Sequence, residues 1–262
     1  MDPQANYDRC LALNPRVGAA IRGAVEACRR APVRSIICSG SIPLGGYIPR
    51  HSDIDLLVVT REPPEGPGWA ALLAELGAPS LSAGLIEAGE LGKPEPVEIR
   101  GLAPRRDYVL HAFDLILLRK YSVVVYGEDV RGSMTDLNER DEITGILAHV
   151  RDVMVPAELA KLAAADRVGL AATNILNVAP VMVRCLYTLR HGTLVSKPEA
   201  LTWAIREFGS RPESAPFVEL CRVILDRMTA EFPGPERDRT IPALFRNAVP
   251  AWVAAVAPAR EA

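Results

Sequence analysis

Two aspartates within a run of apolar residues, segment 52–60, constrain the fold of this chain more than any other feature. The segment is rich in β-branched and aliphatic residues, which predicts a largely buried strand. Side chains at positions i and i+2 of a strand point to the same face. Asp53 and Asp55 therefore share one face of the predicted strand, and Ile54 and Leu56 share the other.

Two neighbouring carboxylates on an apolar strand destabilise the folded state unless a cation compensates their charge. Mg²⁺ is the natural candidate, because it prefers oxygen ligands and binds through one or two carboxylates together with substrate phosphates. The alternative is that both aspartates lie at the end of the strand, where water or loop hydrogen bonds solvate them. The D-x-D motif alone favours this alternative, because short motifs are permissive.

The loop upstream of the aspartates shifts the balance toward a ligand site. Segment 33–38 predicts a strand, and a glycine-containing loop follows it. Gly40 permits a close approach of the backbone, and Ser41 offers a hydroxyl and an N–H to an anion. Gly45 and Gly46 give the turn further conformational freedom. A strand, a Gly-Ser loop and a returning strand with two carboxylates can place phosphate donors beside a metal site.

A third acidic residue, Glu98, stands between Val97 and Ile99 in a strand predicted over 96–100. It either joins the two aspartates or is an ordinary glutamate of an edge strand. Glu95 is a rival, but it lies between two prolines, where pairing in a ladder is disfavoured.

The sequence changes character after about residue 133. Before that point, the patterns predict helices over 5–30, 69–76 and 108–120, and strands over 33–38, 52–60, 96–100 and 122–126. Beyond it, apolar residues recur at three- and four-residue steps and predict helices over 141–153, 156–164, 169–190, 198–208, 215–231 and 241–256. We therefore expect an α/β (α+β) domain, residues 1–137, followed by an all-α domain, residues 138–262.

Composition and charge exclude several classes of protein. The 30 basic and 32 acidic residues give a net charge of −2, which argues against long nucleic acid as a partner. The longest nearly apolar stretch, 248–259, is shorter than the ~20 residues that span a bilayer, so no membrane partner is expected. Five scattered cysteines and an N-terminus without a signal-peptide pattern predict a cytoplasmic protein with reduced thiols and no zinc site.

The predicted helical domain contains a second informative segment, residues 174–204. One helix is expected to stop at Gly192, and the next to begin at Ser196, which forms an S-x-x-E capping box with Glu199. Lys197 then places a cation in the first turn of a helix, at the positive end of the dipole. Either its side chain turns to solvent, or it joins the helix N-terminus in holding an anion such as a triphosphate.

The first domain resembles the nucleotidyltransferase superfamily, and residues 45–58 resemble the aminoglycoside (streptomycin/spectinomycin) adenylyltransferases in particular. The motifs that carry this resemblance are Gly40-Ser41, Asp53-Ile54-Asp55 and Val97-Glu98-Ile99. The resemblance implies a nucleotidyltransferase domain with a small mixed sheet, followed by a helical bundle.

The same resemblance implies roles for individual residues. Asp53 and Asp55 would bind Mg²⁺, with two ions expected, and Glu98 would complete the metal site and act as the catalytic base. ATP would be the co-substrate. The residues implied to hold its phosphates in this domain are Gly40, Ser41 and Ser52.

Residues 174–204 resemble the C-terminal domain of the same adenylyltransferases. The resemblance implies that Arg184 and Lys197 reach the ATP phosphates, so that the site would lie between the two domains. From the residues alone, Arg184 is as readily explained as an arginine that extends from the flank of a helix to water.

The acceptor side matches the family less well. The family has a tryptophan after the third strand and an acidic residue early in the long C-terminal helix. Segment 101–108 contains no tryptophan, and the helix position is Asn174. Arg105 and Arg106 would repel a polycationic drug unless they point away from it. The remaining candidates for acceptor contacts are Asp107, Tyr108 and Asn177.

Three other residues have ordinary structural explanations. Glu128 is expected in a turn at the end of a strand, with a metal-ligand role as the alternative. His51 lies close to the aspartates, but four scattered histidines form no zinc pattern. Trp203 is expected to pack against neighbouring helices rather than to stack on a base.

The sequence therefore predicts a Mg²⁺-dependent enzyme that transfers AMP from ATP to a hydroxyl of a small molecule, an aminoglycoside among the candidates, and releases pyrophosphate. The alternatives are adenylylation of a protein or another metabolite, and a non-catalytic nucleotide-binding or antitoxin-like protein of the same fold. The oligomeric state stays open. A set of three carboxylates favours an enzyme, because a binding protein has little need of a base.

Overall fold

The chain folds into two compact units, Met1–Asn138 and Glu139–Ala262, in the computed structural model. The structure describes residues 2–49, 51–63, 69, 72, 81–92, 97–101, 108–110, 112–163, 168–230 and 235–256. The sequence placed the boundary between residues 137 and 138. Each unit is built around its own secondary structure.

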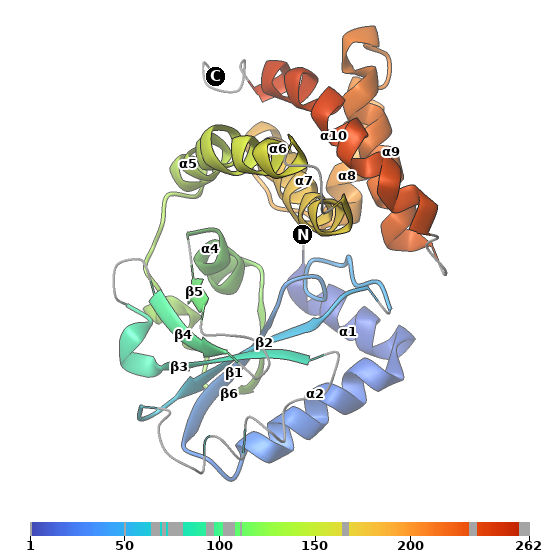
Figure 1. Ribbon diagram of the computed structural model, residues 1–262. Coiled ribbons are helices and arrows are strands. Elements are labelled where there is room, and N and C mark those ends of the chain that lie inside the picture. Colours follow the sequence, from blue (N-terminus) through green and yellow to red (C-terminus); the bar gives the residue numbers. More distant parts are fainter. Residues whose placement is uncertain are drawn as a thin grey trace. The chain divides into compact units, whose positions relative to one another are not determined.

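Among the described residues, the first unit contains a six-stranded sheet with the order β5-β4-β3-β2-β1-β6 (Figure 1). β2 and β3 are parallel, and the other neighbouring strands are antiparallel. The expectation of an α/β domain with a mixed sheet is confirmed. The strands are β1 (Val33–Ser39), β2 (Ile54–Thr60), β3 (Leu81–Glu87), β4 (Val97–Gly101), β5 (Tyr108–Leu110) and β6 (Val123–Gly127).

The alternation of side chains along β2 supplies two separate cores. Ile54, Leu56 and Val58 pack on one face with residues of α2, and Leu57 and Val59 pack on the other face with residues of α4. Figure 1 accordingly shows α1 and α2 on one side of the sheet and α4 on the other. The helical segments of this unit are α1 (Pro3–Leu13), α2 (Pro15–Cys28), α4 (Ala112–Lys120) and the short 3₁₀ turns η1 (Ala88–Glu90) and η2 (Arg131–Ser133).

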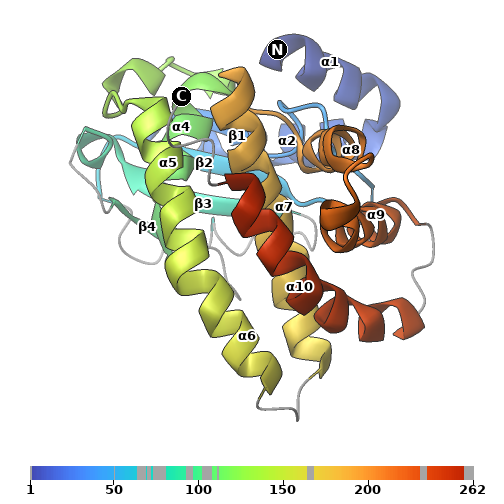
Figure 2. The same cartoon turned by 90° about the horizontal axis from the view of Figure 1, so that it is seen from above.

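The described part of the second unit is helical throughout, as the sequence predicted. Its longest helix, α7, contacts α5, α8 and α10 and occupies the centre of the bundle (Figure 2). Large side chains such as Leu201, Phe217 and Trp252 are almost completely buried. The helical segments are α5 (Glu139–His149), the π-helical turn η3 (Val150–Met154), α6 (Val155–Ala163), α7 (Val168–His191), α8 (Lys197–Phe208), η4 (Pro212–Ser214), α9 (Ala215–Thr229) and α10 (Pro235–Val256).

Two predictions about the strands are wrong. Tyr108–Leu110, expected to begin a helix, form β5, because they pair with β4 through Val97 and Leu110. β3 was not predicted, because a segment with serine, alanine and glycine in succession has low intrinsic β-propensity. Its place between β2 and β4 supplies pairing on both edges, which local composition cannot reveal.

The helix expected over 5–30 is two helices, because the backbone leaves the helical region at Asn14 (φ −129°) and Pro15 starts the second helix. Most of the helix expected over 69–76 lies outside the described residues. Trp69 and Leu72 are described, and both are buried in the core shared with α2.

No helix in the described part of the chain is long and apolar enough to cross a membrane. The five cysteines are buried, and none forms a disulfide. Burial raises the pKa of the Cys185 and Cys221 thiols to about 12. Because the thiolate is the reactive form, these two thiols are poor nucleophiles at neutral pH.

Gly127, the last residue of β6, has φ +80°, and a Cβ there would lie 2.1 Å from the carbonyl oxygen of Arg34. That oxygen belongs to the paired backbone of β1 and cannot move aside. We therefore expect Gly127→Ala to lower the free energy of unfolding by about 2 kcal/mol or more, measured by urea denaturation.

Gly23→Ala is the control, because Gly23 is in α2 and a Cβ there meets no atom within 4 Å. It should raise the free energy of unfolding by about 0.5 kcal/mol or more. Equal effects of the two substitutions would contradict this account.

Candidate functional site

Three polar residues form a row across the middle strands of the sheet. Asp55 of β2 lies opposite Ser39 of β1 and Ser82 of β3, and all three are half-buried. Directly opposite residues of paired strands turn to the same face. This face is the one on which Leu57 and Val59 pack with α4, so the row lies where the apolar core of that face ends.

The loop that follows β1 begins against the carboxylate of Asp55. Gly40 has φ +72°, and a Cβ there would lie 2.2 Å from Asp55 Oδ2. Only a residue without a side chain brings the loop backbone this close to the carboxylate. The loop and the aspartate strand, separated in the sequence, therefore form a single site.

Two backbone hydrogen bonds close this loop: Gly46 N–H donates to the Ser41 carbonyl (2.9 Å), and Gly45 N–H donates to the Ile42 carbonyl (3.0 Å). Ile42 and Leu44 are buried and anchor the loop in the core. The Ser41 hydroxyl is buried, and among the described residues it has no hydrogen-bond partner. A buried polar atom without a partner is rare, so this hydroxyl is suited to bind a ligand atom or a water.

Helix α1 holds the same loop from the other side. The Asn6 side-chain amide donates to the Pro43 carbonyl (2.9 Å), and its Oδ1 accepts from Arg9 Nη2 (3.0 Å). Gly45, with φ +71°, leaves room for this contact, because a Cβ there would lie 3.0 Å from Asn6 Oδ1. The sequence analysis missed Asn6, since nothing local links it to a residue 37 positions away.

Asp53 lies directly before β2, is half-buried, and precedes Asp55 by two residues. Burial raises the pKa of the Tyr47 hydroxyl, and the neighbouring Cys10 and Asp53 add to the rise. The Ser52 hydroxyl accepts a hydrogen bond from Ile48 N–H (3.0 Å), and its own proton can still be donated.

This set of donors fits a hard divalent cation. Asp53 and Asp55 provide carboxylate oxygens, and the serine hydroxyls of the row flank Asp55. Mg²⁺ favours such ligands together with substrate phosphates. Within the described part of the chain, no three histidine, cysteine, aspartate or glutamate residues group to hold a metal ion. The two aspartates would therefore hold Mg²⁺ jointly with oxygens of the substrate and of water.

Residues 21–113 match the family model of the nucleotidyltransferase domain. The matched segment contains the Gly40–Ser41 loop, Asp53 and Asp55. This chain carries a nucleotidyltransferase domain. The predicted class of enzyme is confirmed at the level of that domain.

A comparison with curated proteins found no match. Among solved structures, the chain is similar to spectinomycin adenyltransferase AAD(9) from Enterococcus faecialis, whose crystal structure contains ATP and spectinomycin. The TM-score is 0.59 at 14% sequence identity, over 90% of this chain and 98% of that one. The likeness extends beyond the nucleotidyltransferase domain and agrees with the predicted order of an α/β domain followed by a helical domain.

The register of the sheet separates Glu98 from the two aspartates. β4 is antiparallel to β3, and Arg100 of β4 pairs with Leu85 of β3. Continuing this register by two residues brings Glu98 level with Glu87. Glu87 is opposite Thr60 of β2, five residues from Asp55, or about 16 Å along the strand. The roles of base and third metal ligand assigned to Glu98 do not fit this register, although its side chain lies outside the description. The resemblance to the adenylyltransferases implied these roles, because Glu98 lies in the motif Val97-Glu98-Ile99, whereas the ladder determines its position.

In the second unit, Arg184 and Lys197 lie at the junction between α7 and α8. Arg184 is 5% exposed, and its Nε donates to the Val195 carbonyl (2.9 Å). The explanation of Arg184 as a side chain that reaches water is therefore wrong. Lys197 is the first residue of α8 and is half-buried, so its side chain is not fully in solvent.

The expected helix boundaries around this junction are confirmed. Gly192 ends α7 with φ +65°, and its N–H donates to the Thr188 carbonyl (2.8 Å). Ser196 caps α8, where its hydroxyl accepts from Glu199 N–H (3.4 Å). Trp203 is 7% exposed and meets Tyr187 and Phe208 edge to face, which confirms the prediction of packing.

Most candidates for acceptor contacts lie outside the described part of the chain. This applies to Arg105, Arg106 and Asp107, and to the side chains of Tyr108, Asn174 and Asn177. Glu128 has the expected structural role, because it pairs with Arg34 (2.9 Å) and Arg61 (3.3 Å), which hold the pKa of its carboxyl below the usual value.

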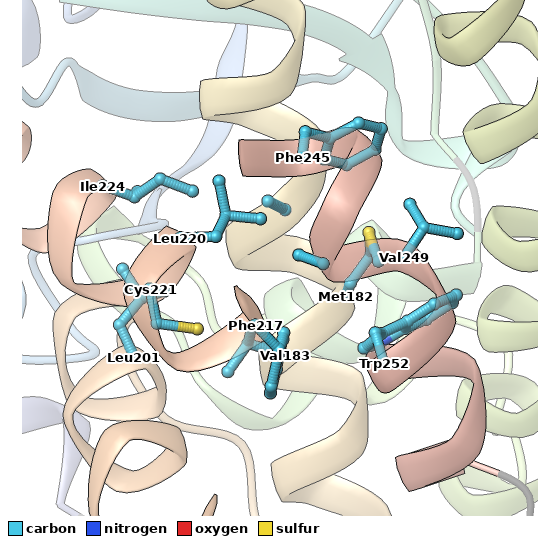
Figure 3. A pocket seen from close by; sticks show the side chains of 12 residues that line it. Met182, Val183, Leu201, Phe217, Leu220, Cys221, Ile224, Phe245, Val249 and Trp252 are labelled. Atoms are coloured by element: carbon cyan, nitrogen blue, oxygen red, sulfur yellow. The ribbon is translucent and has the colours of Figure 1, made fainter. Parts of the chain in front are cut away.

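An apolar pocket in the helical unit contains none of the predicted site residues (Figure 3). Helices α7 to α10 line it with side chains such as Met182, Phe245 and Trp252. The indole nitrogen of Trp252 is buried without a hydrogen-bond partner among the described residues. No acidic or basic side chain lines the pocket, so it does not provide the chemistry of a phosphate or metal site.

We predict that Asn6→Ala loosens the loop of the nucleotidyltransferase domain. Loss of the hydrogen bond to the Pro43 carbonyl should speed amide hydrogen exchange at Gly45 and Gly46 about tenfold, as measured by mass spectrometry or NMR. Gln4→Ala is the matched control, because its side-chain amide lies on the same helix and donates to Asp8 Oδ1 (2.9 Å) instead of to the loop. Unchanged exchange in Asn6→Ala, or the same change in both variants, would contradict the role of Asn6.

Proposed function

We propose that this chain is a Mg²⁺-dependent adenylyltransferase that moves AMP from ATP to a hydroxyl of a small molecule and releases pyrophosphate. The observation that supports it most is the close approach of the Gly40 backbone to the Asp55 carboxylate. That approach puts a loop with an unsatisfied serine hydroxyl next to a pair of carboxylates. Phosphate and metal ligands are thereby combined in one place.

Each described residue of the site has a role in this proposal. Asp53 and Asp55 would hold Mg²⁺, and the chemistry supplied by the bound ion is neutralisation of phosphate charge and orientation of the α-phosphorus. The Ser41 hydroxyl would donate to a phosphate oxygen, and Ser52 would add a second donor. The acceptor oxygen forms a bond to the α-phosphorus, the bond to pyrophosphate breaks, and the proton of the acceptor hydroxyl must leave.

The second unit would contribute cationic groups to the phosphates. Lys197 adds its charge to the N-terminus of a capped helix, which by itself favours anions. The buried Arg184 fixes the residue that precedes the Ser196 cap and thereby positions this helix start. Arg184 is therefore proposed as a positioning residue for Lys197, in addition to the phosphate role that the resemblance implies.

The acceptor is proposed to be a hydroxyl-bearing small molecule of the aminoglycoside or aminocyclitol kind. The similarity in fold to an adenyltransferase solved with ATP and spectinomycin supports this choice.

A cytoplasmic location is proposed as well. MgATP as co-substrate and the absence of disulfides among the five cysteines support it.

The experiment that tests the function measures pyrophosphate release by the purified chain with Mg²⁺ and ATP. Spectinomycin, streptomycin and a panel of unrelated hydroxyl compounds are supplied in separate wells, and calorimetry measures MgATP binding. Release that depends on one acceptor identifies the substrate. Binding of MgATP without release in any well would leave the nucleotide site and reject these acceptors. Absence of MgATP binding would reject the proposed function.

We predict that Asp53→Asn and Asp55→Asn each reduce the rate of AMP transfer about 100-fold or more, because each removes a charged metal ligand. Pyrophosphate release measures the rate, and circular dichroism verifies folding. Glu128→Gln is the control, since its partners Arg34 and Arg61 form a surface ion-pair group on the same domain. Near-normal transfer by either aspartate variant would be incompatible with the proposed metal site.

Lys197→Gln is expected to weaken MgATP binding about tenfold, the size typical of a lost charged hydrogen bond. Calorimetry with a non-hydrolysable ATP analogue measures the change. Arg206→Gln is the matched control, because Arg206 is exposed in the last turn of the same helix. If both variants bind the analogue equally well, Lys197 has no phosphate role.

A further inference from the structure

The row across the sheet identifies a site residue that the sequence analysis did not consider. Ser82 of β3 lies directly opposite Asp55 of β2, in the parallel pair that runs from Ile54 with Leu81 to Thr60 with Glu87. Ser82 and Ile86 alternate onto one face of β3, and Ile86 packs with Leu57 on the α4 face. Ser82 therefore presents its hydroxyl on the face that holds Asp55, two residues after Asp53.

Because of this placement, the group of β3 that faces the proposed metal ligands is a hydroxyl. Ser82 is half-buried, like Asp55, and is surrounded in its strand by the buried Leu81 and Ala83, which turn to the opposite core. Opposite residues of neighbouring strands have Cβ atoms about 5 Å apart. A carboxylate at position 82 would reach a metal ion held by Asp53 and Asp55, whereas Glu98 lies at the other end of the ladder.

The chemistry of a hydroxyl differs from that of a carboxylate at this point. Transfer to an acceptor hydroxyl requires that its proton leave, and a carboxylate close to the acceptor accepts it readily near neutral pH. A serine hydroxyl can bind as a neutral ligand or donate a hydrogen bond, but it is not a proton acceptor of useful strength. The described residues of the row are two serines and an aspartate that is engaged with the proposed metal.

We propose that Ser82 is the third residue of the site and that, as a neutral group in a position suited to a general base, it limits the rate of proton removal. This inference rests on the proposed adenylyl transfer and deepens it. The chain would bind MgATP through two carboxylates. Slow proton removal, caused by the neutral side chain at position 82, would limit the transfer rate, and nucleotide binding would not.

The test installs a carboxylate at this position. Ser82→Asp adds the carboxylate, and Ser82→Asn is the matched control, because it has the same size without the charge. We expect Ser82→Asp to release pyrophosphate from MgATP on the order of tenfold faster or more than Ser82→Asn, with the acceptor that the panel identifies or with water as acceptor. Circular dichroism verifies folding, and the pair Ser82→Glu and Ser82→Gln replaces the first pair if Ser82→Asp does not fold.

A second measurement does not depend on activity. Electron paramagnetic resonance measures the affinity for Mn²⁺ in the presence of a non-hydrolysable ATP analogue. We expect Ser82→Asp to bind Mn²⁺ about tenfold more tightly than Ser82→Asn, because a third carboxylate joins the oxygen ligands. Equal Mn²⁺ affinity of the two variants would overturn the placement of Ser82 at the site.

The remaining outcomes separate this inference from the proposed function. Tighter Mn²⁺ binding without faster release, in a chain that binds MgATP, would overturn the claim that position 82 limits proton removal. If wild type and both variants fail to bind MgATP while Mn²⁺ alone still binds more tightly to Ser82→Asp, the position is correct and the proposed nucleotide function is wrong.

Discussion

The contact between the backbone of Gly40 and the carboxylate of Asp55 is the constraint on which the rest of the site depends. A Cβ at Gly40 would lie 2.2 Å from the carboxylate, so the loop adopts its path only with glycine there. The contact fixes where Ser41 begins, and the hydrogen bonds within the loop determine the rest of its course. Asp55 is in turn fixed by β1 and β3 on either side, so the loop rests against a carboxylate with little freedom to move.

The apolar parts of the sheet make this arrangement possible. β2 distributes its side chains between two cores, and the face shared with α4 is apolar at Leu57 and Val59 and polar at Asp55. A polar row with one carboxylate can exist where this core ends because other residues of the same strands provide the buried area that stabilises the strands. The candidate site residues are thus positioned by strands that are anchored in an apolar core.

The sequence was sufficient to predict the pieces of the site that are local. The apolar run predicted the strand that carries Asp55, and Gly40, Gly192 and Ser196 have the backbone or capping roles expected of them. The order of an α/β unit and a helical unit was also readable, because helical periodicity persists through the second half of the chain. These features depend on residues within a few positions of one another.

The features that the sequence did not predict depend on pairing between distant segments. β3 has too little β-propensity to be recognised, so Ser82 could not be considered. Glu98 was a candidate because of its apolar neighbours, and the resemblance to the adenylyltransferases implied its roles. The ladder argues against Glu98, because β4 runs antiparallel to β3 and carries Glu98 away from Asp55. Asn6 was missed for the same reason, since its partner lies in the loop after β1.

Helix α1 lies outside residues 21–113, the segment that matches the nucleotidyltransferase domain, yet it supports the loop of that domain through Asn6. The helix begins at the Asp2 cap, whose carboxylate accepts hydrogen bonds from Gln4 N–H and Ala5 N–H. A fragment cut to residues 21–113 would lack this helix and, with it, the hydrogen bond that holds the loop at Pro43. The segment that matches the domain is therefore smaller than the unit that holds the shape of its loop.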